Sequence, residues 1–94
     1  MKYITWDEDK NEQLKRDRGI GFEEIITAID HGLLLETRDH PNPNKYPGQK
    51  LHILIIREYV YVVPFVEDEE KRFLKTIIPS RKETKNYFKN KSRI

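Results

Sequence analysis

Phe73-Leu74-Lys75-Thr76-Ile77-Ile78-Pro79-Ser80-Arg81-Lys82-Glu83-Thr84-Lys85 is the stretch that decides the fold, because a strand pattern ends in it and a helix start follows at once. Pro79 has no backbone N–H to give to a sheet ladder and favours the end of a strand. Ser80 and Glu83 have the spacing of a capping box, in which each side chain satisfies a free backbone N–H of the other residue. The sequence therefore predicts a strand over 73–78 and a helix from Ser80 to about Lys91.

Two cations occupy the first turn of this predicted helix. Arg81 and Lys82 follow Ser80 directly, and Lys85 comes one turn later. Acidic residues are the usual choice in a first turn, because the helix dipole is positive at that end. Cations placed against this preference indicate an anionic partner, with phosphate as the obvious candidate.

The chain has the size and composition of one small, highly charged domain over residues 1–94. Apolar and charged residues each make up 36% of the 94 residues, which is typical of a well-solvated folded domain. The absence of cysteine excludes a disulfide framework and a thiolate metal site. No apolar run approaches the roughly 18 residues of a membrane span and no signal peptide opens the chain, so we expect a cytoplasmic protein with no membrane partner. We also expect the protein to need no cofactor.

Charge is distributed unevenly along the chain. Residues 1–30 carry eight acidic and five basic side chains, whereas residues 75–94 carry seven basic side chains and one acidic side chain. A basic end favours a polyanion as partner, and RNA or DNA is the usual one. The alternative is that the lysines only solvate a terminal helix, and charge alone leaves both interpretations open.

Hydrophobic periodicity predicts an α+β fold with the element order β-α-α-β-β-β-β-α. The clearest helix signal is the i, i+3, i+4, i+7 spacing that begins at Phe22, between Gly21 and Gly32. Two apolar runs separated only by Arg57-Glu58 predict a hairpin in an antiparallel meander, with a bulge or a missing partner near Pro64. The other predicted elements are an edge strand over 1–5, a helix from an Asp7 cap to about Asp17, strands over 33–37, 51–56 and 59–66, and a loop over 39–48.

The sequence contains none of the common catalytic motifs. Its three histidines share no metal-ligand spacing, and there is no Gly-rich phosphate loop and no Gly-x-Ser-x-Gly elbow. RNA can still be cut without a metal, because its own 2′-hydroxyl attacks the neighbouring phosphate while side chains position it, move a proton and stabilise charge. Arginine suits the charge, and Lys50 and His52 point the same way from one predicted strand. A strand histidine is, however, more often a half-buried sheet residue than a base.

Three segments, at the separations they have here, resemble the BrnT toxins: Trp6-Asp7-x-x-Lys10, Gly19-Ile20-Gly21-Phe22-Glu23-Glu24 and Ile77-Ile78-Pro79-Ser80-Arg81. The resemblance implies a RelE-like fold, with two N-terminal helices, an antiparallel sheet and a C-terminal helix. It also implies the toxin of a type II toxin–antitoxin pair, which blocks translation by metal-independent cleavage of RNA. The implied partners are RNA and a ribbon-helix-helix antitoxin of the BrnA or CopG kind, through which operator DNA is bound.

The resemblance also suggests roles for individual residues. Arg81 matches the family's arginine after the last strand, and Lys50 stands where the family often has an arginine. The family's usual Lys-His before the glycine is Asp17-Arg18 here, and its basic residue within the last strand is Thr76. With the residue chemistry above, the candidate residues are, for catalysis, Arg81, Lys50 and His52 and, for RNA binding, Arg18, Lys75, Lys82, Lys85 and Tyr87.

A second hypothesis is a non-catalytic module that binds an antitoxin-like protein or nucleic acid. It is motivated by the missing Lys-His pair and by the lack of a clear general base. A phosphate-dominated complex loses affinity steeply as salt rises, whereas an apolar protein contact depends on salt much less. Under the toxin hypothesis we expect the antitoxin to cover the cationic face, because it would then neutralise the charge and block RNA.

Overall fold

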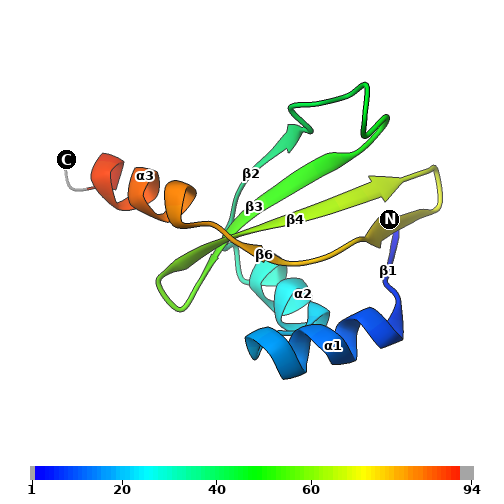
Figure 1. The fold of residues 1–94 in the computed structure, drawn as a ribbon, viewed down its shortest axis with the longest axis horizontal. Helices are drawn as coiled ribbons and strands as arrows, with labels where there is room; N and C mark the ends of the chain where they lie inside the picture. Colours follow the sequence, from blue (N-terminus) through cyan, green and yellow to red (C-terminus); the bar gives the residue numbers. More distant parts are fainter. Residues whose placement is uncertain (1, 92–94) are drawn as a thin grey trace.

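A six-stranded sheet forms the centre of the fold, and helices pack on both of its faces (Figure 1). The computed structural model describes residues 2–91. The elements are β1 (Tyr3–Thr5), α1 (Glu8–Arg18), α2 (Phe22–Asp30), β2 (Leu34–Asp39), β3 (Lys50–Ile56), β4 (Tyr59–Glu67), β5 (Lys71–Leu74), β6 (Ile78–Pro79) and α3 (Arg81–Lys91). The predicted α+β fold and its element order are confirmed, although the last predicted strand is divided into β5 and β6. Within the described residues, no helix combines the length and the apolar character that a membrane span requires.

The sheet is antiparallel except at one edge. Its strands lie in the order β1-β5-β4-β3-β2, and β6 pairs with β4 alongside β5. β1 runs parallel to β5, so the predicted N-terminal edge strand is confirmed over 3–5, whereas Met1 lies outside the described residues. The two-residue connection at Arg57-Glu58 joins β3 and β4 as predicted, and the loop predicted over 39–48 spans 40–49.

The division of the last strand is a correction with a simple cause. The Lys75 N–H donates to the Pro64 carbonyl at 2.8 Å, but Pro64 has no N–H with which to return a bond. The ladder between β4 and β5 therefore stops after Phe65 and Leu74, and it resumes only at Val62 and Ile78. The interruption predicted at Pro64 is confirmed, whereas the prediction that Lys75 and Thr76 belong to a continuous strand is wrong.

The two N-terminal helices begin and end at the residues that the sequence indicates. Asp7 caps α1, because its Oδ1 accepts hydrogen bonds from the Asp9 and Lys10 N–H groups at 2.8 and 3.2 Å. Gly19 follows with φ of 68°, the left-handed conformation that glycine adopts at little cost. Gly21 has no side chain to cap α2, and the Asn11 Oδ1 instead accepts the Phe22 N–H at 2.7 Å. One helix therefore caps the other.

Two apolar layers hold the helices to the sheet. On one face, α1 and α2 bury Leu14, Phe22 and Ile25 against the β3, β4 and β5 side chains of the larger core. On the other face, a smaller cluster of Leu51, Ile53 and Val60 receives Tyr87 of α3. None of the described side chains of α3 is fully buried, so this helix is held much less firmly than α1 and α2.

Glycine in the turn between β3 and β4 should raise the stability of the protein. Arg57 and Glu58 have φ of 50° and 64°, as a type I′ turn requires, but residues with a Cβ are strained there. We expect Glu58→Gly to raise the free energy of unfolding by about 1 kcal/mol, or the melting temperature by about 5 °C. Thermal denaturation followed by circular dichroism measures the change.

Glu69→Gly provides the matched control for this substitution. Glu69 is an exposed residue in the turn between β4 and β5, and its φ is not positive. The same change there should leave the melting temperature unchanged or lower it, because glycine only adds freedom to the unfolded chain. Equal effects of the two substitutions would contradict the assignment of strain to Glu58.

Candidate nucleic-acid interface

The start of α3 is fixed to the sheet by backbone and hydroxyl hydrogen bonds. The Ser80 N–H donates to the Val60 carbonyl at 2.9 Å, and the Val60 N–H donates to the Thr84 Oγ1 at 2.9 Å. The Ser80 Oγ accepts the Glu83 N–H at 3.1 Å, which is one half of the predicted capping box. The other half is not formed, because the Ser80 N–H is already bonded to Val60 and the Glu83 carboxylate pairs with Arg38 at 2.9 Å.

The cations predicted around this helix start are exposed. Arg81, Lys82 and Lys85 lie on α3, and Lys75 lies in the connection between β5 and β6. Within residues 2–91 none of these four side chains forms a hydrogen bond or an ion pair. The single acid of the first turn, Glu83, is engaged by Arg38. Positive charge is therefore available at the start of α3 and is not neutralised from within the described chain.

Arg18 reaches the same part of the molecule from α1. Its guanidinium donates to the Ile77 carbonyl in the connection between β5 and β6. This contact joins the end of the first helix to the segment that leads into Arg81. Arg18 and Arg81 were both candidates from the sequence. Because they are 63 residues apart in the chain, the sequence did not predict that Arg18 contacts the segment just before Arg81.

Lys50 and His52 lie in a different polar cluster, which we call the Glu67 cluster. The Glu67 carboxylate is surrounded by Lys2 at 3.1 Å, Arg72 at 3.1 Å and Lys50 at 3.8 Å. Arg72 also contacts the His52 Nε2 at 3.2 Å. These cations hold the pKa of Glu67 below its usual range, with the Lys2 hydrogen bond as the largest cause. The spacing of residues in the sequence did not indicate that Arg72 belongs to this cluster. Arg72 lies beside Glu67 because these two residues are paired in the register of β4 and β5.

His52 is buried within the sheet, with 2% of its surface exposed. Its ring stacks on Phe65 with centroids 4.1 Å apart, and its Nδ1 lies 2.9 Å from the Thr37 hydroxyl. Burial, and secondarily the positive charge of Arg72, lowers the pKa of His52 to about 4. The imidazole is therefore neutral at pH 7, bonded at both nitrogens and covered, which does not suit direct proton transfer to a bound RNA.

The two groups of candidate residues are separated along the sheet. Lys50 pairs with Phe65 at one end of β4, whereas Pro79, two residues before Arg81, pairs with Tyr61. These two positions on β4 are four residues apart, a distance of roughly 13 Å along the strand. Tyr59 and Tyr61, whose rings lie 5.7 Å apart, are closer in register to Arg81 than Lys50 or His52 is.

Tyr87 lies at the contact between α3 and the sheet. Its ring packs beside Leu51, Ile53 and Val60, and the Lys91 Nζ lies 5.6 Å from its centroid. A ring that fixes the helix to the sheet is poorly placed to stack on a base. The neighbouring Phe88, with 39% of its surface exposed, presents more ring surface to solvent.

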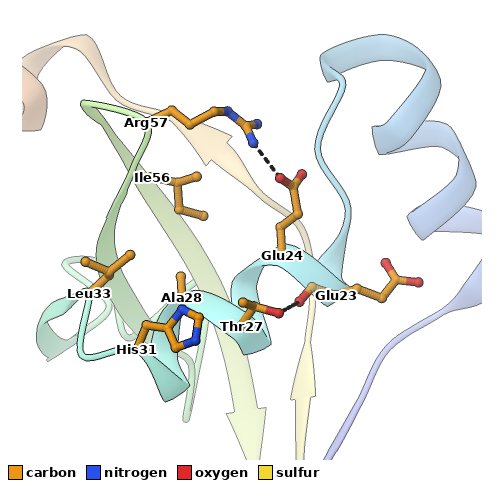
Figure 2. Close-up of a pocket in the computed structure, with 8 residues that line it drawn as sticks. All are labelled: Glu23, Glu24, Thr27, Ala28, His31, Leu33, Ile56 and Arg57. Atoms are coloured by element: carbon orange, nitrogen blue, oxygen red, sulfur yellow. Dashed lines mark hydrogen bonds and ion pairs between the residues drawn. The ribbon is translucent and has the colours of Figure 1, made fainter.

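One cavity is lined by none of the candidate residues. It measures about 370 Å³ and lies between α2 and the β3–β4 hairpin, with Ala28, Leu33 and Ile56 as apolar walls (Figure 2). The Glu24 carboxylate and the Arg57 guanidinium face each other across its rim at 2.6 Å. None of the candidate cations lines it, and its polar walls include the paired Glu24 and Arg57 and the exposed imidazole of His31.

No group of three or more histidine and carboxylate side chains lies close enough to hold a metal ion in the part of the chain that is described. The arrangement around α3 can bind phosphate through exposed cations, and the Glu67 cluster can hold charge but is internally paired. Comparison of the chain with protein-family models, with curated proteins and with solved structures found no match.

Proposed function

We propose that this protein is the toxin of a type II toxin–antitoxin pair, acting in the cytoplasm on RNA without a metal or cofactor. The observation that carries the proposal is the exposed positive charge at the start of α3, formed by Arg81, Lys82 and Lys85, which have no partner within the described residues. Lys75 is exposed too, but its backbone lies opposite Pro64, further along the sheet. The α+β element order, which is the order implied by the BrnT resemblance, adds support. The proposed partner is a ribbon-helix-helix antitoxin that covers these cations.

In the proposed reaction the protein supplies charge and position. The RNA 2′-hydroxyl loses its proton to water and attacks the adjacent phosphorus, the P–O5′ bond breaks, and the departing 5′-oxygen takes a proton from water, so that a 2′,3′-cyclic phosphate and a 5′-hydroxyl result. Arg81 stabilises the charge that develops on the phosphate, and Arg18 and Lys82 hold neighbouring phosphates. His52 takes no direct part in this proposal, because it is buried and neutral.

A non-catalytic binding module is the second candidate, and one observation favours it. The only side chain among the candidates with the chemistry of a general base at neutral pH is His52, and it is buried and bonded to Thr37 and Arg72. A protein that binds RNA through the α3 cations without cutting it would need no base there. The two candidates differ in whether RNA bonds are broken.

Arg81→Ala tests the proposed catalytic role. We expect induced wild-type protein to arrest bacterial growth and fragment bulk RNA, and we expect the purified variant to cleave RNA about 100-fold more slowly. The reason is that removing one donor of charge stabilisation affects the transition state more than the substrate. Gel analysis of RNA with equal amounts of soluble protein measures the rate.

Arg16→Ala is the matched control. Arg16 is an exposed arginine on α1 with no ion pair in the described structure, and its loss should leave both growth arrest and cleavage unchanged. RNA that stays intact beside folded wild-type protein, while still binding to it, would favour the binding module. Cleavage by Arg81→Ala at the wild-type rate would remove Arg81 from the site.

A further inference from the structure

The loop between β2 and β3 encloses a cavity that the function proposed above does not use. We call it the loop pocket, and its walls are Asp39, His40, Pro43, Tyr46, Gln49 and Lys50 around about 280 Å³. The loop is ordered by its own hydrogen bonds. The Tyr46 N–H donates to the Asn42 carbonyl at 3.0 Å, and the His40 N–H donates to the Gln49 carbonyl at 3.0 Å. The pocket is therefore a formed feature of the fold.

One wall of the loop pocket is aromatic. The rings of His40 and Tyr46 lie 4.3 Å apart at an angle of 34°, and Tyr46 keeps 37% of its surface exposed. The Asn42 N–H donates to the His40 Nδ1 at 3.0 Å, which fixes the ring and, in the neutral imidazole, leaves an Nε2–H with no acceptor among the described residues. This pair presents π surface that is not consumed by the hydrophobic core.

The remaining walls are polar and lack partners of their own. Neither the Asp39 carboxylate nor the Gln49 side-chain amide forms a hydrogen bond or an ion pair within residues 2–91. Within the same residues Lys50 is held only by a long contact to Glu67 at 3.8 Å, and its side chain is exposed. The Lys45 Nζ lies 5.5 Å from the centre of the Tyr46 ring. Free acceptors and donors thus accompany the aromatic wall and two cations.

We propose that the loop pocket binds one unstacked base of single-stranded RNA, a proposal that rests on the RNA-directed function above. Aromatic rings that stack on a base, polar groups that meet its edge and lysines that meet the flanking phosphates are the means by which proteins recognise single strands. An apolar side chain of a protein partner would leave Asp39 and Gln49 unsatisfied. Because Lys50 lies roughly 13 Å from the register position of Pro79, an RNA touching both this pocket and α3 spans several nucleotides.

The test uses a fluorescein-labelled 2′-O-methyl-RNA decamer, which cannot be cut because its attacking hydroxyl is blocked. Fluorescence anisotropy gives its dissociation constant for wild-type protein and for Tyr46→Leu, Tyr46→Phe and the control Tyr3→Leu. Tyr3 is 73% exposed on β1, away from the loop. We expect Tyr46→Leu to weaken binding about tenfold with little change in its salt dependence, because stacking is lost and phosphate contacts remain. Tyr46→Phe and Tyr3→Leu should bind as the wild type does.

A second variant addresses the phosphate contacts. A plot of log affinity against log salt has a negative slope. Lys50→Ala should make that slope shallower by about 0.7, the value for one contact to a single strand. Tyr46→Leu that binds the decamer as wild type does, in a protein with an unchanged circular dichroism spectrum, would overturn the loop pocket and leave the proposed function standing. If Tyr46→Leu bound the decamer normally but bound the proposed antitoxin more weakly, the loop would be an antitoxin contact and the base-binding proposal would be wrong. If wild-type protein does not bind the decamer, the proposed base-binding pocket is also wrong. The proposed function is then tested separately by growth arrest and RNA fragmentation.

Discussion

Replacing Asn11 with alanine is expected to lower the free energy of unfolding by about 3 kcal/mol, or the melting temperature by about 15 °C. Asn11 is fully buried and connects the two N-terminal helices. Its Oδ1 accepts the Phe22 N–H at 2.7 Å, and its Nδ2 donates to the Glu23 carboxylate at 3.0 Å. Alanine would leave the first N–H of α2 buried without a partner, a loss that its better helix propensity does not offset. Urea denaturation followed by circular dichroism measures the change.

Asn86→Ala is the control for this prediction. Asn86 is exposed on α3 and forms no hydrogen bond through its side chain in the described structure, so its loss should change stability by less than about 0.5 kcal/mol. Asn11→Ala should also raise the pKa of Glu23, because the Asn11 hydrogen bond is the largest cause of its lowered value. A loss of stability no larger than that of Asn86→Ala would show that Asn11 does not cap α2.

Acidification from pH 7 to pH 5 is expected to cost the protein about 2 kcal/mol of stability through His52 alone. The pKa of His52 is about 4 in the folded protein, against an ordinary value of 6.5. Between pH 6.5 and pH 4 the His52 side chain is protonated in the unfolded chain but stays neutral in the folded protein. The free energy of unfolding therefore falls as the pH falls. Below about pH 4 both states hold the proton and this contribution stops changing. Denaturant titrations at pH 7, 6 and 5 test it.

His52→Gln should flatten this pH dependence, because glutamine can hydrogen-bond to Thr37 or Arg72 but does not titrate. His31→Gln is the matched control, since His31 is an exposed histidine just after α2. That variant should keep the wild-type slope between pH 7 and 5. If the slope persisted in His52→Gln and disappeared in His31→Gln, the assignment of the acid sensitivity to the buried ring would be wrong.

The separation of Arg81 from the Glu67 cluster bears on how the protein would act on RNA. Lys50 is occupied in part by Glu67, and His52 is bonded to Thr37 and Arg72. These residues therefore contribute first to the stability of the sheet. Arg81, Lys82 and Lys85 form no ion pair within residues 2–91, so RNA or an inhibitor can contact them without breaking one there.

Local signals in the sequence were sufficient for most of the fold. The Asp7 cap, the left-handed Gly19, the apolar periodicity that begins at Phe22 and the two-residue turn at Arg57-Glu58 all lie where the sequence predicts them. The Asp7 cap, the Gly19 conformation and the Arg57-Glu58 turn depend on residues only a few positions apart, and the Phe22 periodicity marks the face that α2 buries on the sheet. The interruption at Pro64 was also predictable, because a missing N–H is a property of the residue itself.

The candidate site depended on contacts between residues distant in the chain. Glu83 was predicted to return to Ser80 three residues away, yet it pairs with Arg38, 45 positions distant, because the Ser80 N–H is used by the sheet. His52 is covered by Phe65, and its ring meets Arg72 through the register of three neighbouring strands. The sequence by itself determined the kinds of element, their order and the exposed charge of α3. Only the tertiary structure decided which candidates lie together, since strand register and packing set the neighbours of a side chain and the water it can reach.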